Sequence, residues 1–333
     1  MLNIRTIEMP SVIRKFLGRS LRDMTEVAPD DLRSNNTYPH LVPYPVEVPK
    51  PEPATCQVIC IASGKGGTGK SVVSTNISVA IAKEGLRVLL FDADLGLANA
   101  HLLMGVTPSY DISSVISGER KLAEIVVECP EGVRLIAGGS GFSELAELRD
   151  WQLRNLASQL KALEKDADIV IVDLSAGISP QVMRFLANAH DAIIVTTPDV
   201  TALLDAYATI KMMAKARGDF AVKLIVNRAR NEEDAREAYE KIRAVTARHM
   251  PGITVSLFEW IPHNWYIQNS VNMRQPVVTL HPKSFVTRSF QSMAARIAVD
   301  YRTWKRASEA AAASEGGIPS PSFSSILEST VYA

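Results

Sequence analysis

One short glycine-rich segment constrains this chain more than any other feature, because it works only with a strand before it and a helix after it. Residues 64–71 read G-K-G-G-T-G-K-S and match the phosphate-binding pattern G-x-x-x-x-G-K-[ST] without a mismatch. The apolar run over residues 58–62 predicts the strand, and apolar spacing predicts a helix over residues 70–84. The segment therefore indicates a nucleotide-phosphate site at the start of an α/β domain.

The residue types of the loop suit this role. Glycines let successive backbone N–H groups point at one anion, and the helix N-terminus adds its positive dipole end. We expect Lys70 to lie on the β- and γ-phosphates and the Ser71 hydroxyl to bind Mg²⁺. An ordinary phosphate loop does not need the extra lysine, Lys65, which lies too near the start of the loop to do the work of Lys70. The complete set expected to contact the phosphates is Gly64, Lys65, Gly66, Gly67, Thr68, Gly69, Lys70 and Ser71.

Composition narrows the class of protein further. The chain has 333 residues with 47 % apolar content, enough for one large α/β domain with extensions or two smaller domains. Lys+Arg and Asp+Glu balance at 36 each, so there is no strong signal for nucleic-acid binding. Three cysteines without a C-x-x-C pair fit a reducing cytosol. No apolar run approaches the roughly 20 residues of a membrane span, and no secretory h-region is present, so we expect a cytoplasmic location.

Three regions follow from local composition. Residues 1–54 form an N-terminal extension, in which a short basic segment precedes a proline-rich linker. Residues 55–307 form the phosphate-loop domain, and residues 308–333 are expected to be a flexible tail rich in Ala, Ser, Gly and Pro.

Strands and helices alternate through the central region, which predicts an α/β fold with a doubly wound, mostly parallel sheet of the P-loop NTPase type. Most predicted strands are continuous apolar runs, as expected for strands buried on both faces. The strands are expected at 57–62, 87–92, 133–136, 168–173, 191–196, 221–227 and 254–261. The helices are expected at 70–84, 111–127, 145–163, 179–189, 200–217, 231–249 and 283–307.

Acidic residues follow two of these strands. Asp92 and Asp94 come at the end of the second strand, and Asp173 ends the apolar strand 169–172. The carboxyl ends of parallel strands line the crevice where ligands bind in such sheets. Phosphoryl transfer needs carboxylates near the metal and the attacking water, so these three residues are candidates for both roles. An alternative for Asp92 is that it caps the next helix.

The pattern K-G-G-T-G-K-S resembles the deviant Walker loop of the MinD/ParA class of ATPases. The resemblance implies ATP and Mg²⁺ as ligands and a homodimer that forms on ATP binding, in which Lys65 reaches the partner's phosphates. It implies that Asp94 positions the attacking water, while Asp92 and Asp173 join Ser71 around Mg²⁺. Catalysis would then involve Asp94, Lys65 and Lys70.

The same resemblance places the adenine base near the ends of two later strands. It implies that Asn227 hydrogen-bonds adenine, with Arg228 beside it, and that the loop at 261–264, with Pro262, closes over the base. Related proteins commonly carry an acidic residue where this chain has Asn264.

Three further segments resemble the FlhG (FleN) family of flagellar-number regulators: residues 92–105, 137–146 and 196–208, the last containing the run D-A-Y-A. The resemblance spans about residues 56–300. Two elements of that family are missing. Residues 26–33 resemble the D-Q-A-x-x-L-R element that acts on the GTPase FlhF only loosely, with different spacing. No basic, aromatic membrane helix ends the chain.

The resemblance implies a slow ATPase switch that sets the number or position of a polar machine, most naturally flagella, with an FlhF-like GTPase as a possible partner. A ParA-type DNA- or cargo-partitioning ATPase and a metabolic P-loop synthetase remain as alternatives. Residues 11–24 are a candidate contact element, because helical winding separates their apolar from their basic side chains. Such a helix can lie on the inner membrane surface, fill a partner's groove or fold back onto its own core.

Overall fold

The computed structural model describes residues 56–94, 98–139, 150–218, 220–313 and 324. Contacts divide the chain into two units, Met1–Lys50 and Pro51–Ala333. The first unit lies outside the described residues, and with it the helix predicted over 11–24.

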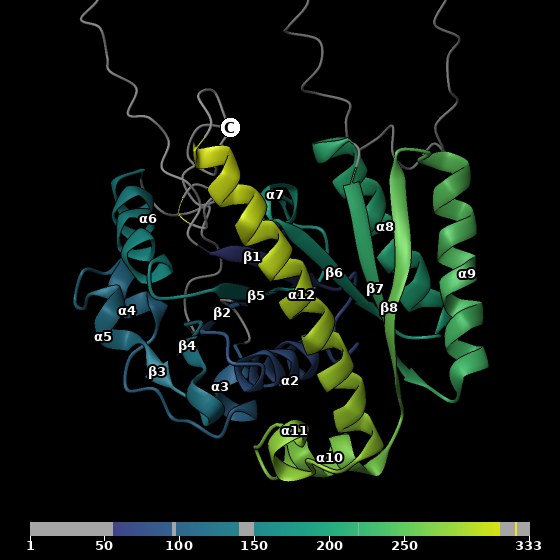
Figure 1. The fold of residues 1–333 in the computed structure, drawn as a ribbon, viewed down its shortest axis with the longest axis horizontal. Helices are drawn as coiled ribbons and strands as arrows, with labels where there is room; N and C mark the ends of the chain where they lie inside the picture. The colour runs from purple at the N-terminus through teal and green to yellow at the C-terminus, as the bar shows by residue number, and fades with distance from the viewer. Residues whose placement is uncertain (1–55, 95–97, 140–149, 219, 314–323, 325–333) are drawn as a thin grey trace, which may run out of the picture. The chain divides into compact units, whose positions relative to one another are not determined.

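The described residues form an eight-stranded sheet in the order β3-β4-β2-β5-β1-β6-β7-β8 (Figure 1). All neighbouring strands run parallel except the short edge strand β3, which pairs antiparallel with β4. This confirms the doubly wound, mostly parallel sheet. The strands are β1 (Gln57–Ala62), β2 (Val88–Ala93), β3 (Val127–Glu128), β4 (Arg134–Ile136), β5 (Ile169–Leu174), β6 (Asp191–Thr196), β7 (Phe220–Ala229) and β8 (Ile253–Pro262).

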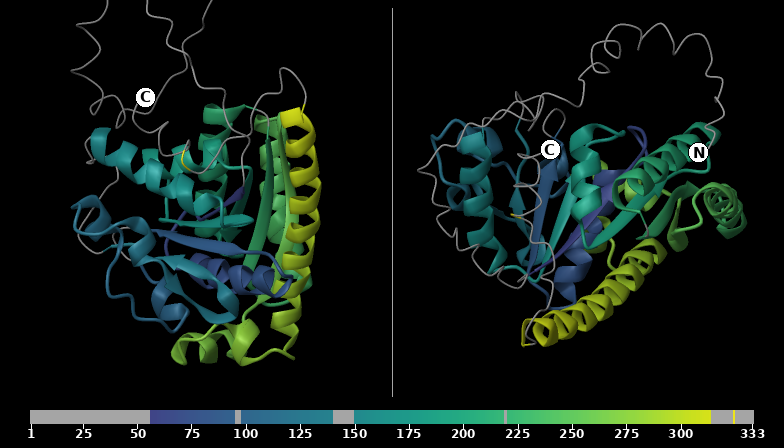
Figure 2. Two further views of the ribbon diagram at one scale, coloured as in Figure 1. Left: turned by 60° about the vertical axis from the view of Figure 1, so that its left-hand side comes forward. Right: turned by 90° about the horizontal axis from the view of Figure 1, so that it is seen from above.

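Helices cover both faces of the sheet (Figures 1 and 2). The long helix α12 crosses one face and packs beside α2, while α6 to α9 lie on the other. The helices are α2 (Lys70–Lys83), α3 (Ala100–Leu103), α4 (Ile112–Ile116), α5 (Leu122–Ile125), α6 (Asp150–Glu164), α7 (Pro180–Asn188), α8 (Val200–Arg217), α9 (Glu232–His249), α10 (Trp265–Asn272), α11 (Val277–Leu280) and α12 (Phe285–Ala313). Among the described helices, none is both long and apolar enough to cross a membrane.

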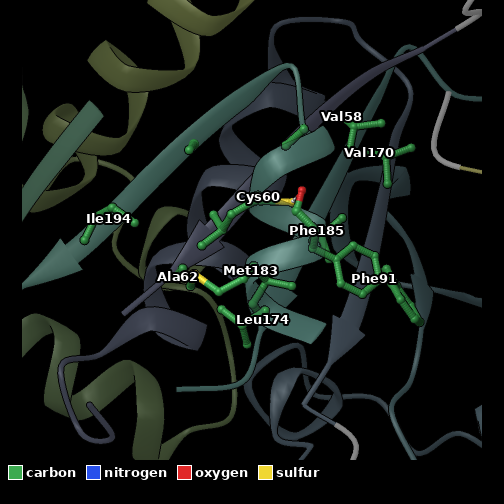
Figure 3. Packing of buried hydrophobic residues seen from close by; sticks show 14 of the residues in the cluster. Val58, Cys60, Ala62, Phe91, Val170, Leu174, Met183, Phe185 and Ile194 are labelled. Carbon is green, nitrogen blue, oxygen red and sulfur yellow. Dashed lines mark hydrogen bonds between the residues drawn. The ribbon is translucent and has the colours of Figure 1, made fainter. Parts of the chain in front are cut away.

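The alternation of side chains along β1 divides the core into two layers. Val58 and Cys60 point to the layer under α7, where Phe185 packs against Phe91 (Figure 3). Ile59 points to the layer under α2 and α12. Burying each large apolar side chain contributes roughly 1.5–3 kcal/mol. All three cysteines are free and buried, as expected for small apolar residues, and burial raises the pKa of each thiol. The result is a rigid central strand that holds the phosphate loop at its end.

Several predicted helices differ from those observed. The helix expected over 111–127 is wrong: Gly118, at φ +82°, follows α4, and the chain then forms α5 and the edge strand β3. The part of the helix expected over 145–163 that is described begins at Asp150, and residues 145–149 lie outside the described residues. The helix expected to end at 307 continues to Ala313, because alanines at 310–313 favour helix. Beyond it, the buried Ser324 donates its backbone N–H to Glu164.

Candidate nucleotide site

The phosphate loop joins β1 to α2 at the centre of the sheet. β1 lies between β5 and β6, so the ends of three parallel strands meet at this point, as at a topological switch point. Gly67 and Gly69 have φ values of +81° and +88°, a conformation that side chains with a Cβ adopt only at a cost. Gly69 also caps α2, and a Cβ there would overlap Nδ2 of Asn227.

Gly64 is required for a different reason. A Cβ on this residue would overlap the backbone carbonyl of Asp205 in α8. The first residue of the loop therefore packs directly on α8, the helix that carries the D-A-Y-A run. The sequence alone gave no sign of this contact, because Gly64 and Asp205 are far apart along the chain.

Lys70 and Asp173 form a buried ion pair. Lys70 Nζ lies 2.7 Å from Oδ1 of Asp173, and the two side chains are 7 % and 0 % exposed. Ser74 donates its hydroxyl to the same carboxylate oxygen at 2.8 Å, and Lys70 reaches the Ser71 hydroxyl at 3.4 Å. The other oxygen of Asp173 is buried and has no hydrogen-bond partner among the described residues. The structure thus brings Lys70, Ser71 and Asp173 together.

Asp92 lies beside Asp173, since the two residues are in register on neighbouring strands. Its carboxylate accepts backbone hydrogen bonds from Asp94 at 3.2 Å and from Asn99 and Ala100 at 3.0 Å. Asp92 therefore caps α3, the alternative that the sequence left open, and its role toward a metal stays a prediction. Burial and the neighbouring Asp173 raise the pKa of Asp92 to about 7.

These groups fit a divalent cation. Mg²⁺ prefers oxygen ligands, and the site offers two adjacent buried carboxylates and the Ser71 hydroxyl. The Asp173 oxygen that has no hydrogen-bond partner among the described residues offers one ligand atom, and burial and the neighbouring Asp173 raise the pKa of Asp92, a repulsion that a bound cation would relieve. Ser71 and Asp173, with Asp92 beside them, would hold Mg²⁺.

Asp94 lies just beyond β2, which ends at Ala93. Asp94 is partly exposed at the mouth of the site, and residues 95–97, which follow it, lie outside the described residues. Its role toward the attacking water stays a prediction.

Lys65 makes its contact within the same chain. Its Nζ hydrogen-bonds the hydroxyl of Thr201 in the first turn of α8, at 2.8 Å. On either side of Thr201, the side chains of Val200 and Leu204 are 70 % and 62 % exposed. The expected contact of Lys65 across a dimer stays a prediction, and α8 is the element from which the lysine would have to be released.

A cavity of about 370 Å³ adjoins the phosphate loop and is lined by the residues expected to surround the adenine base. Asn227 donates to the Thr68 carbonyl at 2.7 Å and accepts from the Arg228 backbone at 2.9 Å, which leaves one amide hydrogen and one lone pair for a ligand. The lining residues are Gly69, Val72, Asn227, Arg228, Pro262, His263, Asn264, Ile267, Gln268, Val271 and Asn272.

The loop at 261–264 supplies a helix cap. The Asn264 side chain accepts from Ile267 N at 3.1 Å and donates to the Pro262 carbonyl at 2.7 Å, so it orients α10. His263 and Gln268, which contact each other at 3.1 Å, add polar groups to the same cavity. The sequence analysis did not identify Gln268 because it did not predict α10, the helix that carries this residue. An N-cap asparagine followed by apolar spacing could have indicated that helix.

Comparisons with known proteins agree with this geometry. The family model described as ParA, NUBPL iron-transfer P-loop NTPase, matches residues 54–298. The antiactivator FleN of Pseudomonas aeruginosa is 32 % identical over 241 residues, which cover 72 % of this chain and 86 % of FleN. The flagellum site-determining protein YlxH of Helicobacter pylori is 32 % identical over 236 residues, covering 71 % of this chain and 80 % of YlxH.

Solved structures show the same similarity. The septum site-determining protein MinD of Pyrococcus horikoshii, complexed with Mg-ADP, has a TM-score of 0.60 and 28 % identity and covers 73 % of this chain and 96 % of its own. MinD in the MinC:MinD complex of Aquifex aeolicus has a TM-score of 0.57 and 28 % identity, covering 73 % and 95 %. Together with the match over residues 54–298, these similarities show that the chain belongs to the MinD/ParA family of P-loop ATPases.

Proposed function

We propose that this chain is an ATP-dependent, dimerising switch that regulates the number or placement of flagella. The observation that carries the proposal is the similarity to both FleN and YlxH, two flagellar proteins, over some 240 residues. The loop at 64–71 lies within residues 54–298, the range that the family model matches. The reaction is ATP + water → ADP + phosphate, run slowly enough for the bound nucleotide to act as a signal.

Lys70 performs the first step of the proposed cycle. When ATP enters, the ammonium group leaves the Asp173 carboxylate, 2.7 Å away, and binds the phosphates. When bound, Mg²⁺ would supply charge neutralisation for the phosphates, and the Asp173 carboxylate that the lysine has left would help to hold it. The backbone of residues 64–70 holds the phosphates in position, and Asp94 orients the water that attacks the terminal phosphorus. Asn227, Arg228 and Pro262 bind the base.

Lys65 makes the switch sensitive to dimerisation. In one chain it is held by Thr201, and in the proposed dimer it leaves that hydroxyl for the partner's phosphates. The exposed Val200 and Leu204 flank the same point, so closing the dimer would bury apolar surface as the lysine is transferred. Assembly and catalysis would then depend on the same contact.

Partner contacts belong to the same proposal. The MinC:MinD complex supports the idea that this chain binds another protein, here a flagellar or polar component such as an FlhF-like GTPase. Residues 11–24 remain our candidate for a peripheral contact with the inner face of the cell membrane or the pole.

A DNA-partitioning function receives no support from α9. Three of its four Lys and Arg side chains are paired within the helix, since Arg236 pairs with Glu232 at 3.0 Å, Lys241 with Glu237 at 2.7 Å and Arg243 with Glu240. Such a helix presents paired charges to solvent rather than a cationic face to phosphates.

A first experiment tests the switch in purified protein. We expect Lys65→Ala to fold normally but to remain a monomer with a non-hydrolysable ATP analogue, as measured by light scattering after size exclusion. Lys215→Ala, an exposed lysine near the end of α8, serves as the matched control and should dimerise. A normal dimer in the Lys65 variant would show that this lysine does not act across an interface.

A second experiment separates hydrolysis from assembly. Asp94→Ala should bind Mg-ATP and dimerise but turn over about 10²–10⁴-fold more slowly, because a positioned carboxylate commonly contributes that much. Unchanged turnover would remove Asp94 from the mechanism.

The flagellar role is tested in cells. Deleting the gene should change the number or position of flagella per cell, as counted by electron microscopy. The wild-type gene should restore the count, and a Lys70→Ala gene should not. Unchanged flagella in the deletion strain would refute the cellular role while leaving the ATPase assignment intact.

A further inference from the structure

Helices α10 and α11 and the start of α12 lie together at one end of the domain (Figure 1). This end carries exposed aromatic side chains. Trp265 is 62 % exposed and Phe285 45 % exposed. Their rings belong to one cluster, in which Trp265, Tyr266 and His281 lie 5.1–5.7 Å apart and Tyr266 lies 5.9 Å from Phe285. Large exposed aromatic groups gathered in this way commonly mark a binding surface.

The segment of the chain that forms this end of the domain carries charge of one sign. Residues 260–299 contain no Asp or Glu but four cations, Arg274, Lys283, Arg288 and Arg296. Arg296 is already paired with Glu259 at 3.1 Å. Lys283 and Arg288 are exposed, flank Phe285 and make no ion pair with any described residue. Trp265, Tyr266, His281, Lys283, Phe285 and Arg288 together form what we call the aromatic–basic surface.

We propose that the aromatic–basic surface docks an acidic segment of a partner protein, with an apolar side chain as its anchor. Aromatic residues and arginine are enriched in the centres of protein interfaces and provide most of their binding energy. The cations are complementary to carboxylates on the partner, and the absence of acids from residues 260–299 removes the repulsion that such a partner would meet.

The amount of charge argues against a lipid surface as the occupant. Anionic membranes are bound by clusters of about four to eight Lys or Arg side chains. The aromatic–basic surface has two unpaired cations, Lys283 and Arg288, too few for such a cluster. Two cations beside an aromatic anchor match the size of a peptide contact instead.

The helix that carries Trp265 also lines the base cavity. Ile267, Gln268 and Val271 of α10 face that cavity, while Trp265 and Tyr266 face the aromatic–basic surface. Any shift of α10 when the base binds would reach both sites, so nucleotide and partner affinities are coupled, and the coupling is reciprocal. This coupling rests on the proposed function, whereas docking itself does not.

A random 16-residue peptide library displayed on phage is the probe that tests the docking. Selected on the wild-type protein without nucleotide, it should yield a class of peptides combining Asp or Glu with a large apolar residue. Synthetic members of that class should bind at least tenfold more weakly to Trp265→Ser/Phe285→Ser. Val299→Ser, which removes another exposed apolar side chain from α12, is the matched control and should bind them normally.

Charge reversal supplies the second variant. Lys283→Glu/Arg288→Glu removes no apolar contact, and selection on it should lose the acidic peptides and enrich basic ones. Identical peptide classes from wild type and both double variants would overturn the proposal. Two other results would also overturn the proposal. One is that the wild type sediments with phosphatidylglycerol vesicles and these variants do not; the other is that the wild type self-associates and these variants do not. If peptides bind as expected but ADP leaves their affinity unchanged, docking stands and the coupling is wrong.

Discussion

The buried ion pair between Lys70 and Asp173 lets one stability measurement test the architecture of the phosphate site. In Lys70→Met, Asp173 stays 0 % exposed and retains only the Ser74 hydroxyl on one oxygen. Leaving a buried charge without its partner costs about 3–5 kcal/mol, a large share of the 5–15 kcal/mol that stabilises a typical domain. Urea unfolding in EDTA without nucleotide measures this loss.

The opposite end of the same helix supplies the control. Lys83 pairs with Glu131 at 3.1 Å, but the two side chains are 32 % and 40 % exposed, so Lys83→Met should cost less than about 1 kcal/mol. Adding Asp173→Asn to Lys70→Met should recover more than half of the loss, because the uncompensated charge is then removed. Equal losses in the two lysine variants, or no recovery in the double variant, would refute the reasoning.

Two further predictions concern packing and pH. Gly64→Ala should cost about 1–3 kcal/mol by pushing on the backbone of α8. A Cβ at position 66 would meet no atom within 4 Å, so Gly66→Ala should change the free energy of unfolding by less than about 1 kcal/mol. Equal losses for the two variants in urea unfolding would show that α8 shifts to accommodate the methyl group of Gly64→Ala. Burial alone would raise the pKa of Asp168, but hydrogen bonds from Arg87 and Tyr301 hold it at about 2. That stabilisation is present above about pH 4 and is lost as the pH falls through about 2. The roughly 1 kcal/mol cost of Tyr301→Phe at pH 7 should therefore shrink by more than half at pH 2; a constant cost in urea unfolding across this range would contradict it.

The sequence identified the fold and the phosphate site because both depend on local patterns. Continuous apolar runs predicted the seven longer strands, and the phosphate loop at 64–71 could be recognised because its pattern occupies eight consecutive residues. Asp173 could be placed because it follows directly on a buried strand. The ion pair with Lys70 could not be read in this way, since it depends on the alignment of β1 with β5.

Three helices were missed, and two of them are too short to show a helical period. α3 and α11 have four residues each, and α3 begins where Asp92 accepts two backbone N–H groups. α10 begins at a side-chain cap, where Asn264 accepts from Ile267 N. In each case a single polar contact or a tertiary neighbour fixes the element, and such contacts leave a weak signal in a sequence.

The central position of β1 also determines when the phosphate site can form during synthesis. Its two neighbours, β5 and β6, begin at Ile169 and Asp191. The ribosome must therefore add 112 residues (169 − 57) after Gln57 before its first strand partner, Ile169, is synthesised. At about 5–20 residues per second, the ribosome needs roughly 6–22 s to deliver it. Until then β1 is an apolar strand with two open edges, the kind of segment that chaperones bind and that aggregates when they do not. The nascent chain therefore gains its phosphate site late, when β5 arrives carrying Asp173, and its base cavity later still, when β7 and β8 supply Asn227 and Pro262.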